Sequence, residues 1–198
     1  MNTLKLNILP STHTNDHQVR IEIDGEDYLP DELGIDPVSF FAQKELYTDG
    51  ILRIARCDCG VEGCGDSGVI VEVGEKTVVW EVENENRLTF EKEEYFKYMK
   101  SISNNYSWEN LERRVERLVG EILINTTHAI DYKYKWASSR IETGKIVISY
   151  EKKDDQGYTK QELIRINWSG EDVEDALSNA EDLIQKCKVQ RQTTSNFT

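Results

Sequence analysis

Three short apolar runs, separated by two glycine-containing turns, constrain the fold of this chain most. Residues 51–55 lead into a turn with three cysteines, residues 69–73 follow that turn, and residues 78–82 follow a second turn at Gly74. Alternation with a period of two is typical of strands, and short turns join neighbouring strands in antiparallel order. We therefore predict a three-stranded antiparallel meander over residues 51–82.

The segment before this meander predicts a hairpin and a short helix. Residues 4–8 and residues 19–23 each alternate between apolar and polar, and a polar run with Pro10 separates them. This pattern predicts an opening β-hairpin. Asp36 before Pro37 is typical of an N-cap followed by the first helical turn, so we expect Phe40 and Phe41 to be the buried residues of a short helix.

Two amphipathic helices are predicted next. Residues 91–106 place acidic residues in the first helical turn, where the helix dipole favours them. Ser107 is the predicted N-cap of the second helix, whose apolar stripe is Trp108, Leu111, Val115, Leu118 and Ile122. The arginines off that stripe are expected to pair with Glu109, Glu112 and Glu121 along the helix; they are Arg113, Arg114 and Arg117.

The rest of the chain predicts an aromatic loop, a second hairpin and a last helix. The loop contains Tyr132, Tyr134 and Trp136, and the hairpin pairs residues 146–148 with residues 163–166. The last helix begins at Ser169 and has an apolar stripe of Val173, Leu177, Ala180, Ile184 and Cys187. The predicted class is α+β: an antiparallel β-meander with flanking helices, a second hairpin and a C-terminal helix.

The chain of 198 residues fits a single α+β domain over residues 1–188, with sub-lobes 1–106 and 107–188 as its natural subdivision. The polar residues 189–198 are expected to form a flexible tail. No run approaches the roughly 20 apolar residues needed to span a bilayer, and the N-terminal residues lack the pattern of a signal peptide. We therefore expect a cytoplasmic protein with reduced thiols.

The formal net charge is −13, and the acidic residues are concentrated in the first half of the chain. Residues 1–50 contain ten Asp and Glu against three Lys and Arg. Such a field repels nucleic acid and anionic membranes and favours encounter with a basic partner. The composition therefore predicts no nucleic-acid or membrane partner, and leaves a protein partner or self-association open, with solubility as the simpler explanation of the charge.

The cysteine turn holds the candidate metal ligands Cys57, Cys59 and Cys64. Zinc needs four donors, usually thiolates and imidazoles, and the spacing C-x-C-x4-C is tighter than the usual C-x2-C pair. Four residues elsewhere could supply the fourth donor: Cys187, which the apolar stripe instead places in a core, and His13, His17 and His128. We therefore expect no cofactor, with zinc as the possible exception.

Two other interpretations of this turn compete with zinc. A reversible disulfide between Cys64 and either Cys57 or Cys59 fits so short a turn. Alternatively, the glycines allow positive φ in a compact hairpin bend and the thiols simply pack beneath it, which is the interpretation that we favour. A nucleophilic thiol is disfavoured here, because the neighbouring carboxylates oppose thiolate formation. No nucleotide-binding, metalloprotease or serine-hydrolase motif is present.

One stretch resembles a group of uncharacterised bacterial proteins. It reads CxCGxxGC at residues 57–64, a strand at residues 69–73, V-x-W at residues 78–80 and F-x-x-x-x-Y at residues 90–95. The resemblance covers roughly residues 50–100 and implies a shared core but no activity. The expectations for site residues, cofactor and partner therefore rest on the residues of this chain alone.

The sequence predicts a non-enzymatic cytoplasmic binding or regulatory protein, because no catalytic set is evident and the charge is asymmetric. An acidic immunity protein or inhibitor that binds a basic protein partner has these properties. The alternative is a zinc- or redox-dependent enzyme or sensor that uses Cys57, Cys59 and Cys64.

Overall fold

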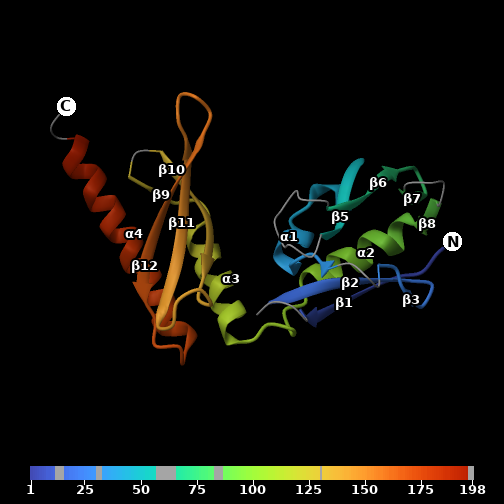
Figure 1. Ribbon diagram of the computed structural model, residues 1–198, viewed down its shortest axis with the longest axis horizontal. Helices are drawn as coiled ribbons and strands as arrows, with labels where there is room; N and C mark the ends of the chain where they lie inside the picture. The colour runs from blue at the N-terminus through green and yellow to red at the C-terminus, as the bar shows by residue number, and fades with distance from the viewer. Residues whose placement is uncertain (12–15, 30–32, 57–65, 83–86, 130, 196–198) are drawn as a thin grey trace. The chain divides into compact units, whose positions relative to one another are not determined.

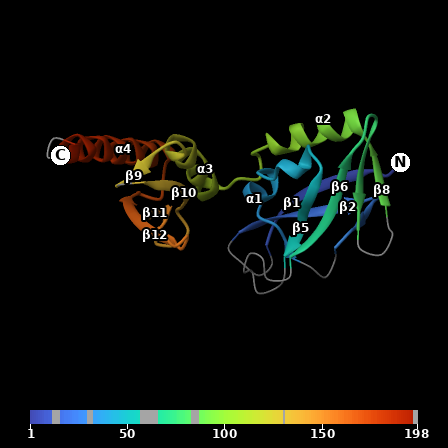
Figure 2. The same cartoon turned by 90° about the horizontal axis from the view of Figure 1, so that it is seen from above.

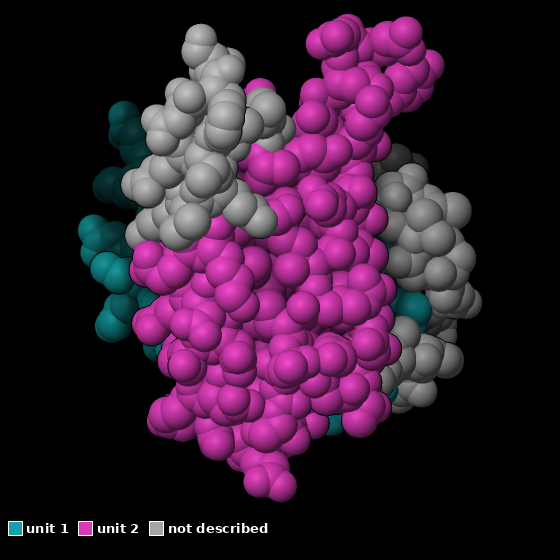
Figure 3. All heavy atoms as spheres, turned by 90° about the vertical axis from the view of Figure 1, so that its left-hand side faces the viewer, with its two compact units in different colours: residues 1–108 teal, residues 109–198 magenta. Residues whose placement is uncertain are grey.

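The computed structural model describes residues 1–11, 16–29, 33–56, 66–82, 87–129 and 131–195, with the side chains of the last helix described as far as Cys187. Within these ranges the protein is α+β, with antiparallel sheets and four α-helices, the last at the C-terminal end of the chain (Figure 1). The predicted fold class is therefore confirmed. The chain divides into two compact units, residues 1–108 and residues 109–198, which Figure 3 colours differently.

Unit 1, residues 1–108, contains two antiparallel sheets. A three-stranded sheet has the order β1-β2-β3, with bounds Leu4–Pro10, His17–Ile23 and Glu26–Asp27. A five-stranded sheet has the order β4-β5-β6-β7-β8, with bounds Leu33–Gly34, Gly50–Arg56, Ser67–Val73, Thr77–Glu81 and Arg87–Glu91. The predicted hairpin is β1 and β2, and the predicted meander is β5, β6 and β7, so both are confirmed.

Hydrogen bonds join the two sheets of unit 1 at two places, which gives a closed, barrel-like circuit of strands. On one side the Val19 amide donates to the Ile35 carbonyl at 2.8 Å. On the other side the Asn2 amide donates to the Thr89 carbonyl at 2.7 Å, and the Thr89 amide donates to Asn2 Oδ1 at 2.8 Å. The bridge between Val19 and Ile35 requires a glycine at position 34, because a Cβ atom there would lie 2.3 Å from the Val19 carbonyl oxygen.

Helix α2, Lys92–Ser103, covers this barrel-like circuit (Figure 2). Its Tyr95 and Met99 side chains are buried in the core, which includes Trp80 from β7 and Phe90 from β8. The short helix α1, Pro37–Phe41, begins as predicted, since the Asp36 side chain accepts hydrogen bonds from the amides of Val38 and Ser39. A 3₁₀ turn, η1, Lys44–Leu46, follows it.

Unit 2, residues 109–198, is a four-stranded antiparallel sheet with two helices. The sheet has the order β12-β11-β10-β9, with bounds Thr159–Asn167, Lys145–Lys153, Tyr132–Ser138 and Thr127–His128. Helix α3, Leu111–Leu123, and helix α4, Val173–Ser195, pack against one another. Both helices share one core with Ile146, Ile148 and Tyr150, so both cover the same face of the sheet (Figure 2).

Two predictions in this unit were wrong, and a third was right only in part. The predicted aromatic loop is strand β10, in which Tyr132 and Tyr134 face the core between exposed lysines. Helix α3 is capped by Asn110 and not by Ser107, because Asn110 Oδ1 accepts the Arg113 amide at 2.9 Å. Of the predicted stripe, Val115 is buried and Leu111 and Ile122 pack partly buried against the core, but the face that packs inward is centred further round the helix, so that Val119 and Leu123 are fully buried as well.

The last helix also begins later than predicted. Gly170 has a φ of +83° between Ser169 and the helix, and Asp172 Oδ1 accepts the Asp175 amide at 2.7 Å, so α4 begins at Val173. The backbone remains helical to Ser195, through most of the stretch that the sequence predicts as a tail.

Candidate functional site

The cysteine turn lies outside the residues that the structure describes, because residues 57–65 fall in one of the gaps. The zinc, disulfide and hairpin-bend interpretations of Cys57, Cys59 and Cys64 therefore all stay predictions. In the described part of the chain, no group of three or more His, Cys, Asp or Glu residues is placed to hold a metal ion.

The candidate fourth donors lie in different places. His17 is at the start of β2 in unit 1, where its ring lies 5.1 Å from the ring of Trp108 between centroids. His128 and Cys187 meet in unit 2, with His128 Nδ1 3.4 Å from Cys187 Sγ. The predicted core position of Cys187 is supported, since this half-buried side chain packs against the core of unit 2. His13 lies outside the described residues.

The negative charge of the protein belongs almost entirely to unit 1. Residues 1–108 contain 21 Asp and Glu against 10 Lys and Arg, whereas residues 109–198 contain 16 against 14. A net charge of −11 on about half of the chain creates a field that attracts cations and basic surfaces. A binding site for a cationic group is therefore best sought in unit 1.

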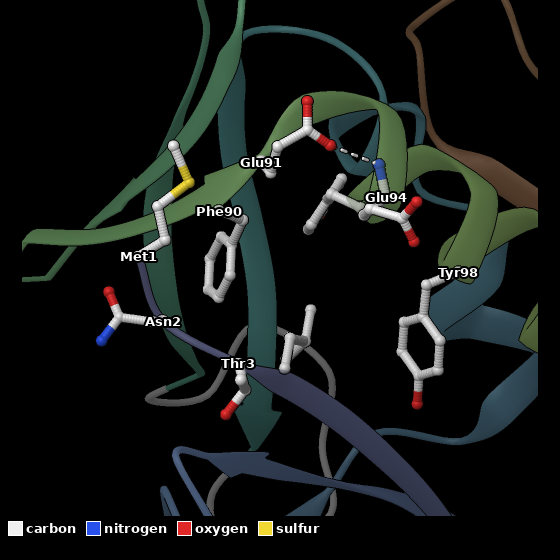
Figure 4. A pocket seen from close by; sticks show the side chains of 9 residues that line it. Met1, Asn2, Thr3, Phe90, Glu91, Glu94 and Tyr98 are labelled. Atoms are coloured by element: carbon white, nitrogen blue, oxygen red, sulfur yellow. Dashed lines mark hydrogen bonds between the residues drawn. The ribbon is translucent and has the colours of Figure 1, made fainter.

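Unit 1 has a pocket of about 290 Å³ where the start of β1, the end of β8 and the first turns of α2 come together (Figure 4). The rings of Phe90 and Tyr98 flank it, and Glu91 and Glu94 lie on its helix side. The complete lining is Met1, Asn2, Thr3, Leu4, Phe90, Glu91, Glu94, Tyr95 and Tyr98. The pocket thus combines apolar and aromatic walls with two carboxylates.

Hydrogen bonds fix the strand that forms one wall of this pocket. Asp24, in the turn after β2, accepts the Thr3 amide and the Asn2 side-chain amide, each at 2.7 Å. These hydrogen bonds, that of the Thr3 amide first, hold the pKa of Asp24 below its ordinary value. On the helix side, the Tyr98 hydroxyl accepts the Leu6 amide at 2.7 Å, which ties α2 to β1. The wall is therefore held from both sides before any ligand binds.

The two carboxylates of the pocket lie at the N-terminal end of α2. Glu91 is the N-cap, and its Oε2 atom accepts the Glu94 amide at 2.8 Å. Glu94 is itself exposed, and its nearest described cation is the equally exposed Lys97, with 3.9 Å between Nζ and Oε1. Exposed pairs of this length contribute little, so Glu94 can change partner at small cost.

Tyr95 closes the pocket from within the core. Its side chain is buried, and burial raises the pKa of its hydroxyl well above the usual range, so the phenol stays neutral. The lining contains no cysteine, serine or histidine that could act as a nucleophile or general base. This arrangement is suited to holding an amphipathic cation: the apolar stem contacts the rings and the charged head lies beside Glu91 and Glu94.

A second polar cluster, in unit 2, has a structural character. Glu116 in α3 is buried, and its oxygens accept hydrogen bonds from Arg113, Arg140, Ser138 Oγ and the Ser139 amide. The prediction did not include Glu116 as the partner of Arg113, which is buried beside it. The pairing predicted for Arg117 with Glu109 and Glu121 is confirmed. Because its oxygens already accept these hydrogen bonds, Glu116 holds residues 138–140, at the end of β10, against α3. It has little capacity left for a ligand.

No family model, no curated protein and no solved structure matches this chain. In the described residues, no helix is both long enough and apolar enough to cross a membrane.

Sequence reasoning missed the pocket, although parts of its signal are visible. The sequence pattern explains the acidic start of α2 by the helix dipole alone, but two of these residues, Glu91 and Glu94, also line a pocket with an aromatic wall. The approach of residues 1–4 to β8 is a contact across more than 80 positions, which no local pattern encodes. Likewise, the meeting of His128 and Cys187 spans 59 positions.

Proposed function

We propose that unit 1 of this protein has a non-enzymatic binding function and recognises a basic protein partner, as an acidic immunity protein or inhibitor does. The contact residues are those of the pocket in unit 1. The observation that carries the proposal is the pairing of two carboxylates with aromatic walls, in a unit with 21 acidic against 10 basic residues. Steering by the field of unit 1 would bring such a partner in, and the pocket would fix its orientation.

The pocket fits one lysine or arginine side chain of the partner. The aliphatic stem would lie against Phe90 and Tyr98, and the cationic head would pair with Glu94. A cation beside an aromatic ring contributes about 0.5–1 kcal/mol at an exposed site, and an exposed ion pair contributes about 0.2–1 kcal/mol. One such anchor is too weak to act alone, so the partner must also contact other parts of unit 1.

A protein partner is favoured over a small cation because unit 1 also exposes apolar side chains on a sheet face. Ile51 in β5 and Ile70 in β6 are register partners, and they are 69% and 51% exposed. Glu81 pairs with Ile70 in register on the next strand, and Glu72 lies two residues further along β6. Arg87 of β8 is ion-paired with both carboxylates, at 2.7 Å from Glu72 and 3.9 Å from Glu81. An apolar pair bordered by such a charged cluster matches the mixed surface of a protein better than it matches a small ion.

The test is a titration of ¹⁵N-labelled full-length protein with an unstructured peptide of alternating lysine and glycine, followed by amide chemical shifts. We expect the largest shifts at the amides of Phe90, Glu94 and Tyr98, and we expect Glu94→Gln to weaken the affinity about two- to fivefold. Glu93→Gln is the matched control, because Glu93 is exposed on the same helical turn but does not line the pocket. It removes the same charge and should change the affinity less.

Equal weakening by the two variants would show that the peptide senses only the net charge, and it would refute the pocket as the contact site. Shifts spread evenly over unit 1 would refute it as well. A peptide of alternating glutamine and glycine should leave the pocket amides unshifted, and shifts of similar size with it would contradict recognition of a cation.

A further inference from the structure

Unit 2 brings a thiol, an imidazole and a carboxylate together from three separate elements. Cys187 lies in α4, His128 is the second residue of β9, and Glu162 lies in β12. The Cys187 Sγ atom is 3.4 Å from His128 Nδ1, and His128 Nε2 is 3.5 Å from Glu162 Oε1. The imidazole therefore stands between the thiol and the carboxylate, with one ring nitrogen facing each.

The imidazole is held in this orientation by its surroundings. The ring of Tyr150 lies 5.6 Å from the His128 ring between centroids, and the Tyr150 hydroxyl shares a hydrogen bond of 2.9 Å with Thr126 Oγ1. The His128 side chain is 17% exposed, Glu162 is 43% exposed, and Cys187 is half-buried. The cluster is thus supported from the core side and stays within reach of solvent.

This order of groups suits proton transfer and does not suit metal binding. A metal ion would need both sulfur and carboxylate on the same side of the imidazole, whereas here the two ring nitrogens face different partners. A thiol beside Nδ1 can give its proton to the imidazole, and a carboxylate at Nε2 orients the ring and stabilises the imidazolium that forms. The other titratable groups packed around His128 are Tyr132, its register partner in β10, and Tyr150 in β11.

We propose that Cys187 is a nucleophilic thiol that takes an acyl group from an ester or thioester, with His128 as its base and Glu162 as the positioning residue. As His128 Nδ1 accepts the thiol proton, the sulfur bonds to the acyl carbon. The bond from that carbon to the alcohol or thiol leaving group breaks, and the imidazolium returns the proton to the leaving group. Water then cleaves the acyl-cysteine with the same base, which restores the thiol and releases the acid.

This activity is separate from the proposed binding function, since its residues all belong to unit 2 and the pocket belongs to unit 1. The clustered cysteines of the first half are replaced in the experiment, so that only Cys187 reacts. The starting protein is therefore the full chain with Cys57, Cys59 and Cys64 changed to serine.

The first measurement is the rate of alkylation of Cys187 by iodoacetamide as a function of pH. An activated thiol should react roughly ten times faster than a free thiol near pH 6, because its larger thiolate fraction outweighs its lower intrinsic nucleophilicity. His128→Gly should bring the rate to that of a free thiol, and added imidazole should restore it in part. Glu162→Gln should give an intermediate rate, and Glu151→Gln, a carboxylate change on the neighbouring strand, should leave the rate unchanged.

The second measurement uses p-nitrophenyl acetate, with release of nitrophenolate and mass of the modified peptide as readouts. We expect a stoichiometric burst and an acetyl group on Cys187, both lost in His128→Gly. A free-thiol rate of alkylation in the starting protein would overturn the proposal. Fast alkylation without acetylation would overturn its acyl chemistry. Circular dichroism of each variant separates loss of reactivity from loss of fold, and imidazole rescue requires a folded chain.

Discussion

The two units of this protein bury polar atoms in opposite ways. Unit 1 closes its strands around an aromatic core, in which Trp80 Nε1 and the Tyr95 hydroxyl are buried with an interaction between them but no well-formed hydrogen bond within the described part of the chain. Unit 2 leaves its sheet open, covers one face with two helices, and buries a carboxylate, Glu116, with several donors around it. Unit 1 thus buries polar atoms that belong to large aromatic side chains, whereas unit 2 buries a charged group and surrounds it with hydrogen-bond donors.

The two units also differ in where they place the carboxylates that matter most to our proposals. In unit 1 the carboxylates that we single out, Glu91 and Glu94, lie at the end of a helix and stay exposed, where they cost little and can meet a cation. In unit 2 a buried charge has to be compensated by arginines, so Arg113 and Arg140 serve the fold. Unit 1 therefore keeps carboxylates available at its surface, whereas the best-placed arginines of unit 2 are already engaged.

Glu116→Ala tests how much the buried carboxylate contributes to the stability of unit 2, and it has the largest expected effect. The change leaves the buried Arg113 and the half-buried Arg140 without their carboxylate, so we expect the free energy of unfolding to fall by about 3–5 kcal/mol. Glu121→Ala on the same helix is the control, since Glu121 is exposed and pairs with Arg117 at 2.9 Å; it should cost less than about 1 kcal/mol. Denaturant unfolding gives both values, and hydrogen exchange should place the loss in unit 2. Equal losses of unfolding free energy for the two variants would show that the buried Glu116 stabilises the unit no more than the exposed Glu121 does.

Gly34→Ala tests the closure of unit 1. The new Cβ atom would lie 2.3 Å from a backbone oxygen, which cannot rotate away, so β2 and β4 must separate. We expect a loss of about 1–3 kcal/mol, together with faster hydrogen exchange of the Val19 amide. Gly74→Ala, whose Cβ would meet the Thr77 carbonyl oxygen at 3.3 Å, should cost less. Unchanged protection of Val19 would mean that the two sheets are not coupled there.

The smallest expected effect is that of Tyr95→Phe. Because the buried Tyr95 hydroxyl interacts with the Trp80 indole without a well-formed hydrogen bond, its removal should change the free energy of unfolding by less than about 0.5 kcal/mol, or raise it. Tyr150→Phe in unit 2 removes a hydroxyl that is hydrogen-bonded to Thr126, and it should cost about 0.5–1.5 kcal/mol. Thermal and denaturant unfolding compare the pair directly. A larger loss for Tyr95→Phe would reverse the distinction between the two cores.

Local patterns predicted most of the strands and helices, because their signals lie within a few residues. The alternation in β5, β6 and β7 and the Asp36 cap of α1 are of this kind. The same reasoning failed for β10, although tyrosines and lysines alternate there, because the composition was read as a loop. It also placed two helix starts several residues too early, since several polar residues near each start could have served as the cap.

The α+β class, the meander and the concentration of acidic residues in the first half follow from local sequence patterns, because period, turn chemistry and charge are properties of neighbouring residues. Only the tertiary structure decided that residues 1–4 meet β8 and α2 to form a pocket, that Glu116 is enclosed by arginines, and that His128 lies between Cys187 and Glu162. Each of these depends on chain closure over tens of residues, where the pairing is chosen by the packing of a whole unit and not by local spacing.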